Sequence, residues 1–512
     1  MASFSPTNEQ RGCLNLFNTG ESLRIEAAAG SGKTTTLHYL LSDGALPGRA
    51  LYTSFGRKVI DEAKAQFPSG RIDVRTNHSL AFRSVGSRWQ AQGRLVSRIP
   101  AFQLASDMGW ADATFSPYCD QRTGAYFVLR TIDRYCQSLD DRISVRHAAG
   151  LGSGRMAGES AKALAALLVN LAHDVWARMM SPRDRMPITH DVYLKVFCLA
   201  KPQLGYRLIM LDEGQDTTEL LIGLLSIQER CNLVVVGDSH QQIYSWRGAT
   251  NAMSSFKTAH TARLTQSFRF GPAIASIASD VLLSYCDASL IVTGLDSIPS
   301  ELKAMESVRC VLSRTNCGLI AELVTHVDVE PHARFGVVGG VADLEKLLEG
   351  AAALKRGERT HVSELAEFTS WREVEEASEE EYGRHLTPLV KMVEQHGLPK
   401  LFGVVAMVRG NERDEESCKT LFSTAHKSKG REFESVMLTD DFTIRTAEAD
   451  AGENGGWNVE EGNLLYVAVT RAKLSLDPYA CYAATDAITT ARALRTANTA
   501  TATPARAPIA EL

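Results

Sequence analysis

LRIEAAAGSGKTTTL, residues 23–37, decides the fold of this chain. The pattern indicates a buried strand, a loop of small residues and the first turn of a helix. Gly30, Ser31 and Gly32 let the backbone curl so that its N–H groups point at phosphate oxygens. The helix that follows adds the positive end of its dipole to the same anion. The stretch therefore predicts a nucleoside triphosphate site in an α/β fold.

The residues after the glycines supply the chemistry of a phosphate loop. Lys33 is a point charge for the β- and γ-phosphates, Thr34 offers a hydroxyl to Mg²⁺, and Thr35 is a further candidate for binding the nucleotide. The strict pattern begins with glycine, and Ala27 stands there instead. A chance Gly-rich loop is the competing interpretation. The apolar strand before the loop and the helical run after it favour binding of ATP or GTP with Mg²⁺.

Length and composition bound the class of protein. A chain of 512 residues is too long for one core, so about two to four domains are expected. The net charge of −5 argues against a wholly basic nucleic-acid coat, but a local basic groove would suffice for binding. The ten cysteines form no CxxC pair, which is typical of reduced thiols in a cytosolic protein. No signal peptide or membrane span is predicted.

Strand signals divide the chain into two α/β halves. Apolar strands alternate with helical runs, as in a doubly wound parallel sheet, and strand signals vanish over two helical insertions. The last residues are rich in Ala, Thr, Arg and Pro, which predicts disorder. The expected boundaries are 1–86 with 206–260 for the first domain, 87–205 for its helical insertion, 261–340 with 419–482 for the second domain, 341–418 for a small helical insertion, and 483–512 for the tail.

An acidic pair follows the strand in LIMLDEGQD. Asp212 can hold Mg²⁺ through water, and Glu213 can accept a proton from an attacking water. Acidic pairs are also common at ordinary strand ends. The phosphate loop upstream favours the catalytic interpretation.

A second motif, GDSHQQIYSWRGA at 237–249, also begins where a strand ends. Gln241 is placed to sense the γ-phosphate by a hydrogen bond. Tyr244 and Trp246 are aromatics beside Arg247, and bases stack on such faces at about 1–3 kcal/mol each. A core position for the two aromatics is the competing interpretation. Their polar neighbours make a poor core stripe, so a single-strand contact is favoured.

These motifs recur in the order found in superfamily 1 helicases of the UvrD/Rep type, which the chain resembles. After the phosphate loop come DEGQD, GDSHQQIYSWRGA, LTQSFRFG, STAHKSKGREF and LLYVAVTRAK. The wording of LTQSFRFG and the short insertion before STAHKSKG are most similar to the F-box DNA helicase branch, although no F-box segment precedes the core. The resemblance implies two RecA-like P-loop domains with parallel sheets, each carrying a mainly helical insertion.

The resemblance also implies roles for residues around ATP. Gln10 would read the adenine edge, Phe268 would stack on the adenine, and Glu432 would bind the ribose hydroxyls. Arg269 and Arg471, from the second half, would reach the γ-phosphate as arginine fingers.

Single-stranded DNA contacts are implied for a further group of positions. They are Phe55, His78, Tyr244, Trp246, Arg247 and His426. An ordinary capped or surface histidine is the competing interpretation for His78 and for His426.

The expected function is an ATP-dependent DNA helicase or translocase acting in repair, recombination or replication, and the resemblance implies that it moves 3′→5′ on single strands. A translocase that strips bound proteins with little unwinding is the alternative. A helicase–nuclease subunit is disfavoured because no carboxylate-rich nuclease domain follows YVAVTRAK. Expected partners are single-stranded DNA and single-strand/duplex junctions, with recombination or single-strand-binding proteins as candidates. The expected location is the cytoplasm, associated with the nucleoid, or the nucleus if the source is eukaryotic.

Overall fold

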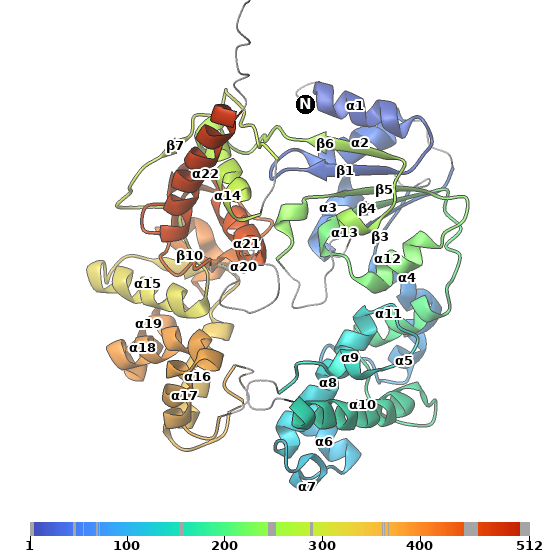
Figure 1. The fold of residues 1–512 in the computed structure, drawn as a ribbon, viewed down its shortest axis with the longest axis vertical. Helices are drawn as coiled ribbons and strands as arrows, with labels where there is room; N and C mark the ends of the chain where they lie inside the picture. Colours follow the sequence, from blue (N-terminus) through green and yellow to red (C-terminus); the bar gives the residue numbers. More distant parts are fainter. Residues whose placement is uncertain are drawn as a thin grey trace, which may run out of the picture.

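The computed structural model contains two parallel sheets flanked by helices, with a helical part attached to each (Figure 1). It describes residues 5–44, 48–54, 56–67, 70, 72–152, 158–243, 252–286, 290–360, 362, 364–366, 368–444 and 459–501. In these residues no helix is long and apolar enough to cross a membrane.

The first sheet has six strands within the described residues, in the order β3-β2-β4-β5-β1-β6. The strands are β1 Leu23–Ala27, β2 Ala50–Ser54, β3 Ile72–Thr76, β4 Leu208–Asp212, β5 Asn232–Gly237 and β6 His260–Leu264. All pairings are parallel, and β2 and β4 are buried along their whole length. The carboxyl ends of β1, β5 and β4 therefore meet at one edge, where ligands of such sheets bind.

Helices cover both faces of this sheet. They are α1 Asn8–Phe17, α2 Lys33–Asp43, α3 Arg57–Gln66, α4 Asn77–Ala81, α12 Glu219–Ser226 and α13 Ala252–Ser255, with short turns η1 Phe82–Gly86, η2 Gly214–Asp216 and η3 Ser239–Gln241. Both η2 and η3 directly follow a strand end, so they lie at the edge to which the phosphate loop also belongs.

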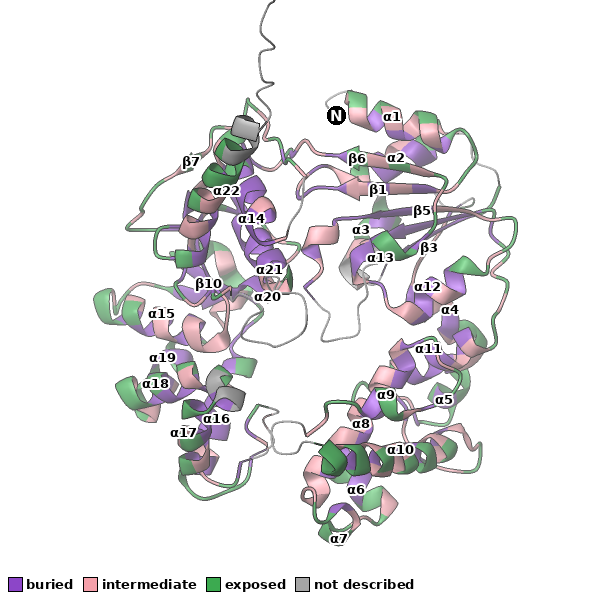
Figure 2. Cartoon of the chain, in the orientation of Figure 1, coloured by how far each residue is buried: buried purple, intermediate pink, exposed green. Residues whose placement is uncertain are grey.

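The second sheet also has six strands in the part of the chain that the structure describes, in the order β7-β12-β11-β8-β10-β9. The strands are β7 Glu301–Leu302, β8 Cys310–Ser313, β9 Phe335–Val337, β10 Thr420–Thr424, β11 Phe433–Leu438 and β12 Ala472–Asp477. Its helices are α14 Pro272–Tyr285, α15 Asn316–Val329, α20 Ala425–Ser428, α21 Val459–Val469 and α22 Tyr482–Thr501. Buried residues fill α14 and α21 where they pack inward (Figure 2).

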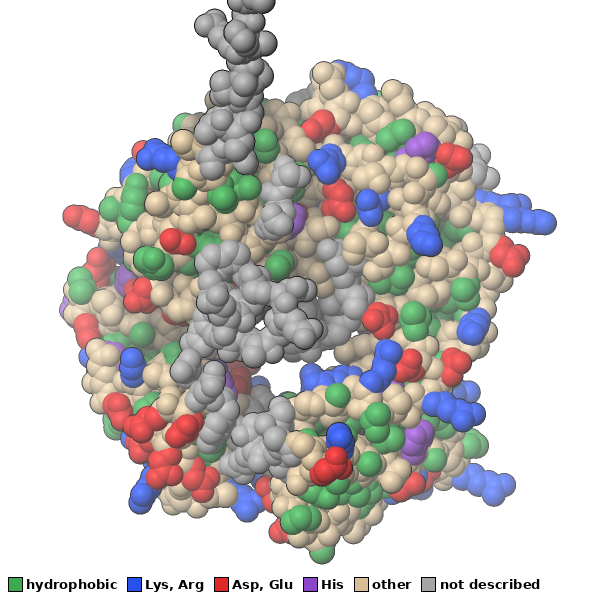
Figure 3. Space-filling model, viewed as in Figure 1, with side chains coloured by type: hydrophobic (Ala, Val, Ile, Leu, Met, Phe, Trp, Pro, Cys, Tyr) green, Lys and Arg blue, Asp and Glu red, His purple; other side chains and the backbone are tan. Residues whose placement is uncertain are grey.

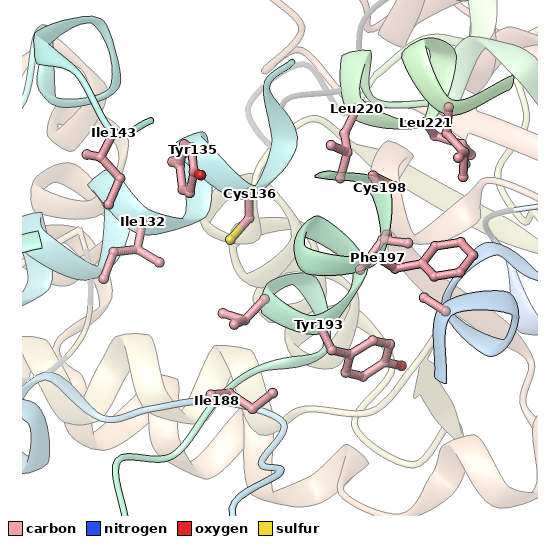
Figure 4. Packing of buried hydrophobic residues seen from close by; sticks show 14 of the residues in the cluster. Ile132, Tyr135, Cys136, Ile143, Ile188, Tyr193, Phe197, Cys198, Leu220 and Leu221 are labelled. Atoms are coloured by element: carbon pink, nitrogen blue, oxygen red, sulfur yellow. The ribbon is translucent and has the colours of Figure 1, made fainter. Parts of the chain in front are cut away.

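The helical part between β3 and β4 continues the core of the first sheet. It contains α5 Ser87–Ala91, α6 Ala101–Met108, α7 Asp112–Phe115, α8 Gln121–Gln137, α9 Val145–Ala148, α10 Gly158–Met180 and α11 His190–Leu199. Tyr135 and Cys136 of α8, Tyr193 and Phe197 of α11, and Leu220 of α12 belong to one buried cluster (Figure 4). Because the cluster includes strand residues as well, this part is anchored to the first domain.

The smaller helical part lies between β9 and β10. It contains α16 Ala342–Lys355, α17 Trp371–Glu379, α18 Thr387–His396 and α19 Leu398–Val408, with turns η5 Glu381–Leu386 and η6 Asn411–Ser417. Acidic side chains gather on this part in the view of Figure 3, and α17 carries four of the glutamates. Arg359 reaches Asp120 of the larger helical part at 3.3 Å.

The strand at 260–264 corrects one expected boundary. Residues 261–340 were expected in the second domain, whereas β6 pairs with β1 from Leu23↔His260 to Ala27↔Leu264. The first sheet therefore takes this strand as its edge. Alternation along a short strand shows that a strand forms but not which sheet it joins.

The helix α22 corrects the expected disordered tail as far as Thr501, and residues 502–512 lie outside the described residues. It packs on α14, where Ser284 Oγ donates to the Ala487 carbonyl at 3.0 Å. Its buried residues at this contact are alanines, including Ala484 and Ala487. Alanine favours helix and lets two helices approach closely, so a run poor in large apolar residues still folds here.

Candidate nucleotide site and nucleic-acid interface

The phosphate loop joins β1 to α2 with two residues in the left-handed region. Gly30 has φ +73° and Gly32 has φ +76°, conformations that side chains rarely adopt. A Cβ on Gly30 would also lie 2.6 Å from Ser267 Oγ and 2.7 Å from Arg269 Cβ. Glycine is therefore required at this position, and the loop lies directly against the segment that carries Arg269.

The polar atoms of the loop fit a phosphate chain. Within the described residues, Ser31 Oγ is buried without a hydrogen-bond partner, beside the first turn of α2. A buried orphan hydroxyl at a helix N-terminus suits an anion. Lys33 Nζ lies 3.9 Å from Glu213 Oε1, and Thr34 and Thr35 follow in the same turn. The structure thus brings the loop and the acidic pair together.

The side expected to hold the base is formed by α1 and the segment after β6. Gln10 is buried, and a Cβ on Gly32 would lie 3.6 Å from its Nε2 and 3.5 Å from Phe268 Cδ2. Gln10 Oε1 accepts from the Thr7 N–H, and its Nε2 donates to Thr36 Oγ1 at 3.1 Å. The amide is thereby oriented, and it keeps one donor and one acceptor position for an adenine edge. The Phe268 ring is 41% exposed, so its face is open for stacking.

The acidic pair has two different environments. Asp212 is buried at the end of β4, and burial together with the Glu213 charge raises its pKa to about 6. Tyr52 donates a hydrogen bond to its Oδ2. Burial also raises the pKa of Glu213, but the charges of Lys33 and Lys429 outweigh it and lower that pKa overall. Glu213 is therefore the more acidic member of the pair and stays ionised at lower pH than Asp212.

The backbone at Glu213 is strained, with φ +54° in a residue other than glycine. Gln215 Nε2 donates to Glu213 Oε2 and fixes the carboxylate. The described residues contain no group of three or more His, Cys, Asp or Glu side chains that could hold a metal ion. A Mg²⁺ at Thr34 and Asp212 would complete its oxygen shell with phosphate and water, as this ion usually does.

Asp238 connects the groups that follow β5. Gln241 Nε2 donates to Asp238 Oδ2 at 2.6 Å, and the Asp238 N–H donates to Gln215 Oε1 at 3.1 Å. Through Gln215 the same aspartate is linked to Glu213. The two residues expected to act at the γ-phosphate, Gln241 and Glu213, therefore share one buried anchor.

The opposite side of the site carries the two arginines. Arg269 Nε donates to Glu432 Oε2 at 2.7 Å, and its Nη1 donates to the Thr470 carbonyl at 3.1 Å. Arg471 is 1% exposed, and burial with the charge of Arg269 lowers its pKa to about 9. The charge of Arg471 also lowers the pKa of Glu213, and its guanidinium donates to the carbonyls of Val467 and Arg431 within the second domain. Glu432 is half exposed, as a ribose contact requires.

Two further residues, Lys429 and Tyr466, lie at the site. Lys429 Nζ lies 2.7 and 2.9 Å from the Asp216 carboxylate oxygens and donates to the Gln241 carbonyl at 2.7 Å. Tyr466 places its hydroxyl between the phosphate loop and Asp238. Their position inside the motifs STAHKSKGREF and LLYVAVTRAK is the sequence signal that points to them.

The expected DNA contacts are only partly described. Phe55, Tyr244, Trp246 and Arg247 lie outside the described residues.

Two histidines from the expected DNA contacts are described. His78 on α4 has its Nε2 3.0 Å from Asp191 Oδ1 and its ring edge against Tyr193, so it is held between the first domain and the larger helical part. His426 lies on α20 in the second domain, where burial and the charge of Arg314 lower its pKa to about 4. The two histidines thus come from opposite domains.

Comparison with known proteins agrees with this arrangement. Residues 157–260 match the UvrD/REP helicase N-terminal domain, and residues 322–477 match the UvrD-like helicase C-terminal domain. The first range contains β4 and β5, and the second contains β9 to β12.

Individual relatives point the same way. F-box DNA helicase 1 of Gallus gallus is 29% identical over 92% of this chain and 48% of its own length. F-box DNA helicase protein 1 of Schizosaccharomyces pombe is 26% identical over 92% of this chain and 57% of its own. ATP-dependent DNA helicase PcrA of Leuconostoc citreum is 26% identical over 51% of this chain and 37% of its own. The chain spans about half the length of the F-box relatives. With two RecA-like domains in the matched order, the chain belongs to the UvrD-like helicases.

Proposed function

We propose that this chain is an ATP-dependent DNA helicase that moves 3′→5′ along single-stranded DNA and unwinds duplex ahead of it. The observation that carries the proposal is a phosphate loop in one domain faced by arginines at the other. Lys33 and Glu213 lie on the first side, and Arg269 and Arg471 on the second. The direction of movement follows from the resemblance to UvrD/Rep enzymes, and the names of the relatives support DNA as the substrate.

Mg²⁺·ATP supplies the bond that is cleaved and a cation that offsets its charge. Lys33 and the N–H groups of the loop hold the phosphates. Gln241 orients the attacking water, and the ionised carboxylate of Glu213 accepts its proton. Arg269 and Arg471 stabilise charge that develops on the terminal phosphoryl group, the largest contribution in related reactions.

Hydrolysis is coupled to movement because the site is split between domains. Arg269 is paired with Glu432 in this structure, so reaching the phosphate requires the second side to move or the pair to rearrange. Closure with ATP and opening after hydrolysis would then shift DNA contacts on the two domains relative to each other. The acidic surface around α17 repels phosphate, so we expect the DNA to avoid that end of the molecule. Work on DNA repair or recombination intermediates, in the nucleoid or the nucleus, is the setting we infer.

The proposal is tested by measuring ATP hydrolysis with and without single-stranded DNA, and strand displacement on duplexes with a 3′ or a 5′ tail. We expect strong stimulation of hydrolysis and displacement of the 3′-tailed duplex. Lys33→Ala should abolish both, whereas Lys64→Ala, at an exposed position on α3, should change neither.

Each result has a defined meaning. Hydrolysis that single-stranded DNA does not stimulate would overturn the proposal. Stimulated hydrolysis without displacement of either duplex would instead identify a translocase that strips bound proteins. Displacement of the 5′-tailed duplex alone would reverse the proposed direction.

A further inference from the structure

We propose that Tyr466 is a positioning residue through which the second domain sets the Asp238–Gln241 pair at the ATP site. The role in ATP hydrolysis rests on the proposed function. The contact itself rests only on the hydrogen bonds of the Tyr466 hydroxyl. Tyr466 lies on α21, and both partners of its hydroxyl belong to the first domain.

The Tyr466 hydroxyl is one link in a buried chain of hydrogen bonds. It accepts from the Ala29 N–H of the phosphate loop at 3.0 Å and donates to Asp238 Oδ2 at 3.2 Å. The same Oδ2 accepts from Gln241 Nε2 at 2.6 Å. Ala29 and Tyr466 are fully buried, and Asp238 and Gln241 are 1% and 6% exposed. A side chain of the second domain therefore connects the phosphate loop to the glutamine expected at the γ-phosphate.

The helix α21, which carries Tyr466, also contacts the end of η3, the turn that contains Gln241. Asn463, one turn earlier on α21, donates from Nδ2 to the Gln242 carbonyl at 3.2 Å. The His240 ring also stands edge-on to Tyr466, with ring centroids 6.3 Å apart. The contact is thus a fitted interface between α21 and η3, and movement of α21 would be felt at Gln241.

The hydroxyl is the essential group because both of its partners need it. Burial raises the pKa of the Tyr466 phenol, so the group stays protonated and keeps donating to Asp238. Without it, the Ala29 N–H loses its acceptor and Asp238 loses a donor, in a region closed to water. The Asp238 carboxylate would then be held less firmly. Because Gln241 donates to this carboxylate, its amide would orient the attacking water less often.

Tyr466→Phe removes this hydroxyl and keeps the ring. We expect kcat for DNA-stimulated ATP hydrolysis to fall about tenfold, while KM for ATP changes by less than about twofold. In a Gln241→Ala background the same substitution should cost less than about twofold, because its effect passes through Gln241. A full tenfold loss in that background would overturn the proposed route.

Tyr285→Phe is the matched control. Tyr285 is another buried tyrosine of the second domain, and its hydroxyl donates to Asp486 Oδ2 at 2.8 Å, away from the ATP site. It should leave kcat unchanged even if it lowers thermal stability. An equal loss of kcat in both variants would assign the effect to general destabilisation and refute a positioning role.

Hydrogen exchange separates this inference from the proposed function, because it needs no catalysis. In nucleotide-free protein, Tyr466→Phe should speed amide exchange in the segments around Ala29 and Asp238, and Tyr285→Phe should not. Unchanged exchange in both segments would overturn the contact. A wild-type chain that hydrolyses no ATP would refute the proposed function and leave this measurement decisive for Tyr466.

Discussion

The two sides of the nucleotide site are built differently. On the first side, each functional group follows the end of a parallel strand and is fixed by a tight turn, with Gly30 at φ +73° and Glu213 at φ +54°. On the second side, Arg269 and Arg471 donate their hydrogen bonds to other groups of the protein. Arg269 donates to Glu432 and to the Thr470 carbonyl, and Arg471 donates to the carbonyls of Val467 and Arg431. The first side is therefore preset by the sheet, whereas the second depends on how its domain docks.

The two arginines differ in how much each contributes to the stability of the fold. Arg471 is fully enclosed and donates to the carbonyls of Val467 and Arg431, so it supports the fold as well as facing the site. Arg269 is 18% exposed, and its carboxylate partner is 48% exposed. A partly exposed pair of this kind contributes little to stability. Replacing Arg269 should therefore affect ATP hydrolysis far more than stability, whereas replacing Arg471 should affect both.

The largest expected effect comes from Arg269→Ala. We expect kcat for ATP hydrolysis to fall about 10³–10⁵-fold, as for other arginine fingers. The loss of unfolding free energy should stay at about 1 kcal/mol, because the ion pair is partly exposed and only one carbonyl loses its donor. Arg471→Ala should lose as much activity and also lower the melting temperature, because buried carbonyls lose their donor. The measurements are DNA-stimulated hydrolysis and thermal unfolding.

Arg263→Ala serves as the control, since Arg263 is an exposed position on β6 and should leave both quantities unchanged. Equal destabilisation by Arg269→Ala and Arg471→Ala would break the distinction between the two arginines.

The sequence predicts the first side of the nucleotide site better than the contacts made by the second side. The phosphate loop and DEGQD each combine a strand end with a local turn, so residues close in sequence carry the whole signal. The bond from Ala29 to Tyr466 joins residues 437 positions apart, and no local pattern encodes it. Matching to the family motifs reached Arg471, five residues away, but gave Tyr466 no role. The sheet that takes β6 was likewise decided by pairing with β1 and not by its own residues.

Lys429→Gln tests the ion pair between Lys429 of the second domain and Asp216 of the first. The Lys429 and Asp216 side chains are 12% and 10% exposed, so removing the cation leaves a nearly buried carboxylate without its partner, at a cost of about 3–5 kcal/mol. We expect a clearly lower melting temperature and roughly a tenfold lower kcat, since Gln241 also loses its contact with the second domain.

Lys427→Gln is the matched control, because Lys427 pairs with the exposed Asp343 at 2.9 Å, away from η2 and η3. It should cost less than about 1 kcal/mol and leave kcat intact. Adding Asp216→Asn to Lys429→Gln should recover stability but not kcat, since the neutral amide needs no cation. Recovery of both would show that the pair supports only folding.

The smallest effect concerns acid sensitivity of the second side at His426. Its pKa of about 4 lies below the usual value of about 6.5, because burial and the charge of Arg314 disfavour the protonated ring. The unfolded chain therefore takes up the proton first, and the stability that the neutral ring contributes is present above about pH 6.5 and lost as the pH falls through about 4. We expect His426→Gln to lose less melting temperature than the wild type between pH 7 and 5, and His332→Gln, at an exposed position, to follow the wild type. Identical pH dependence in all three proteins would show that a protonated ring at His426 is tolerated, and that the second side is no more sensitive to acid than the first.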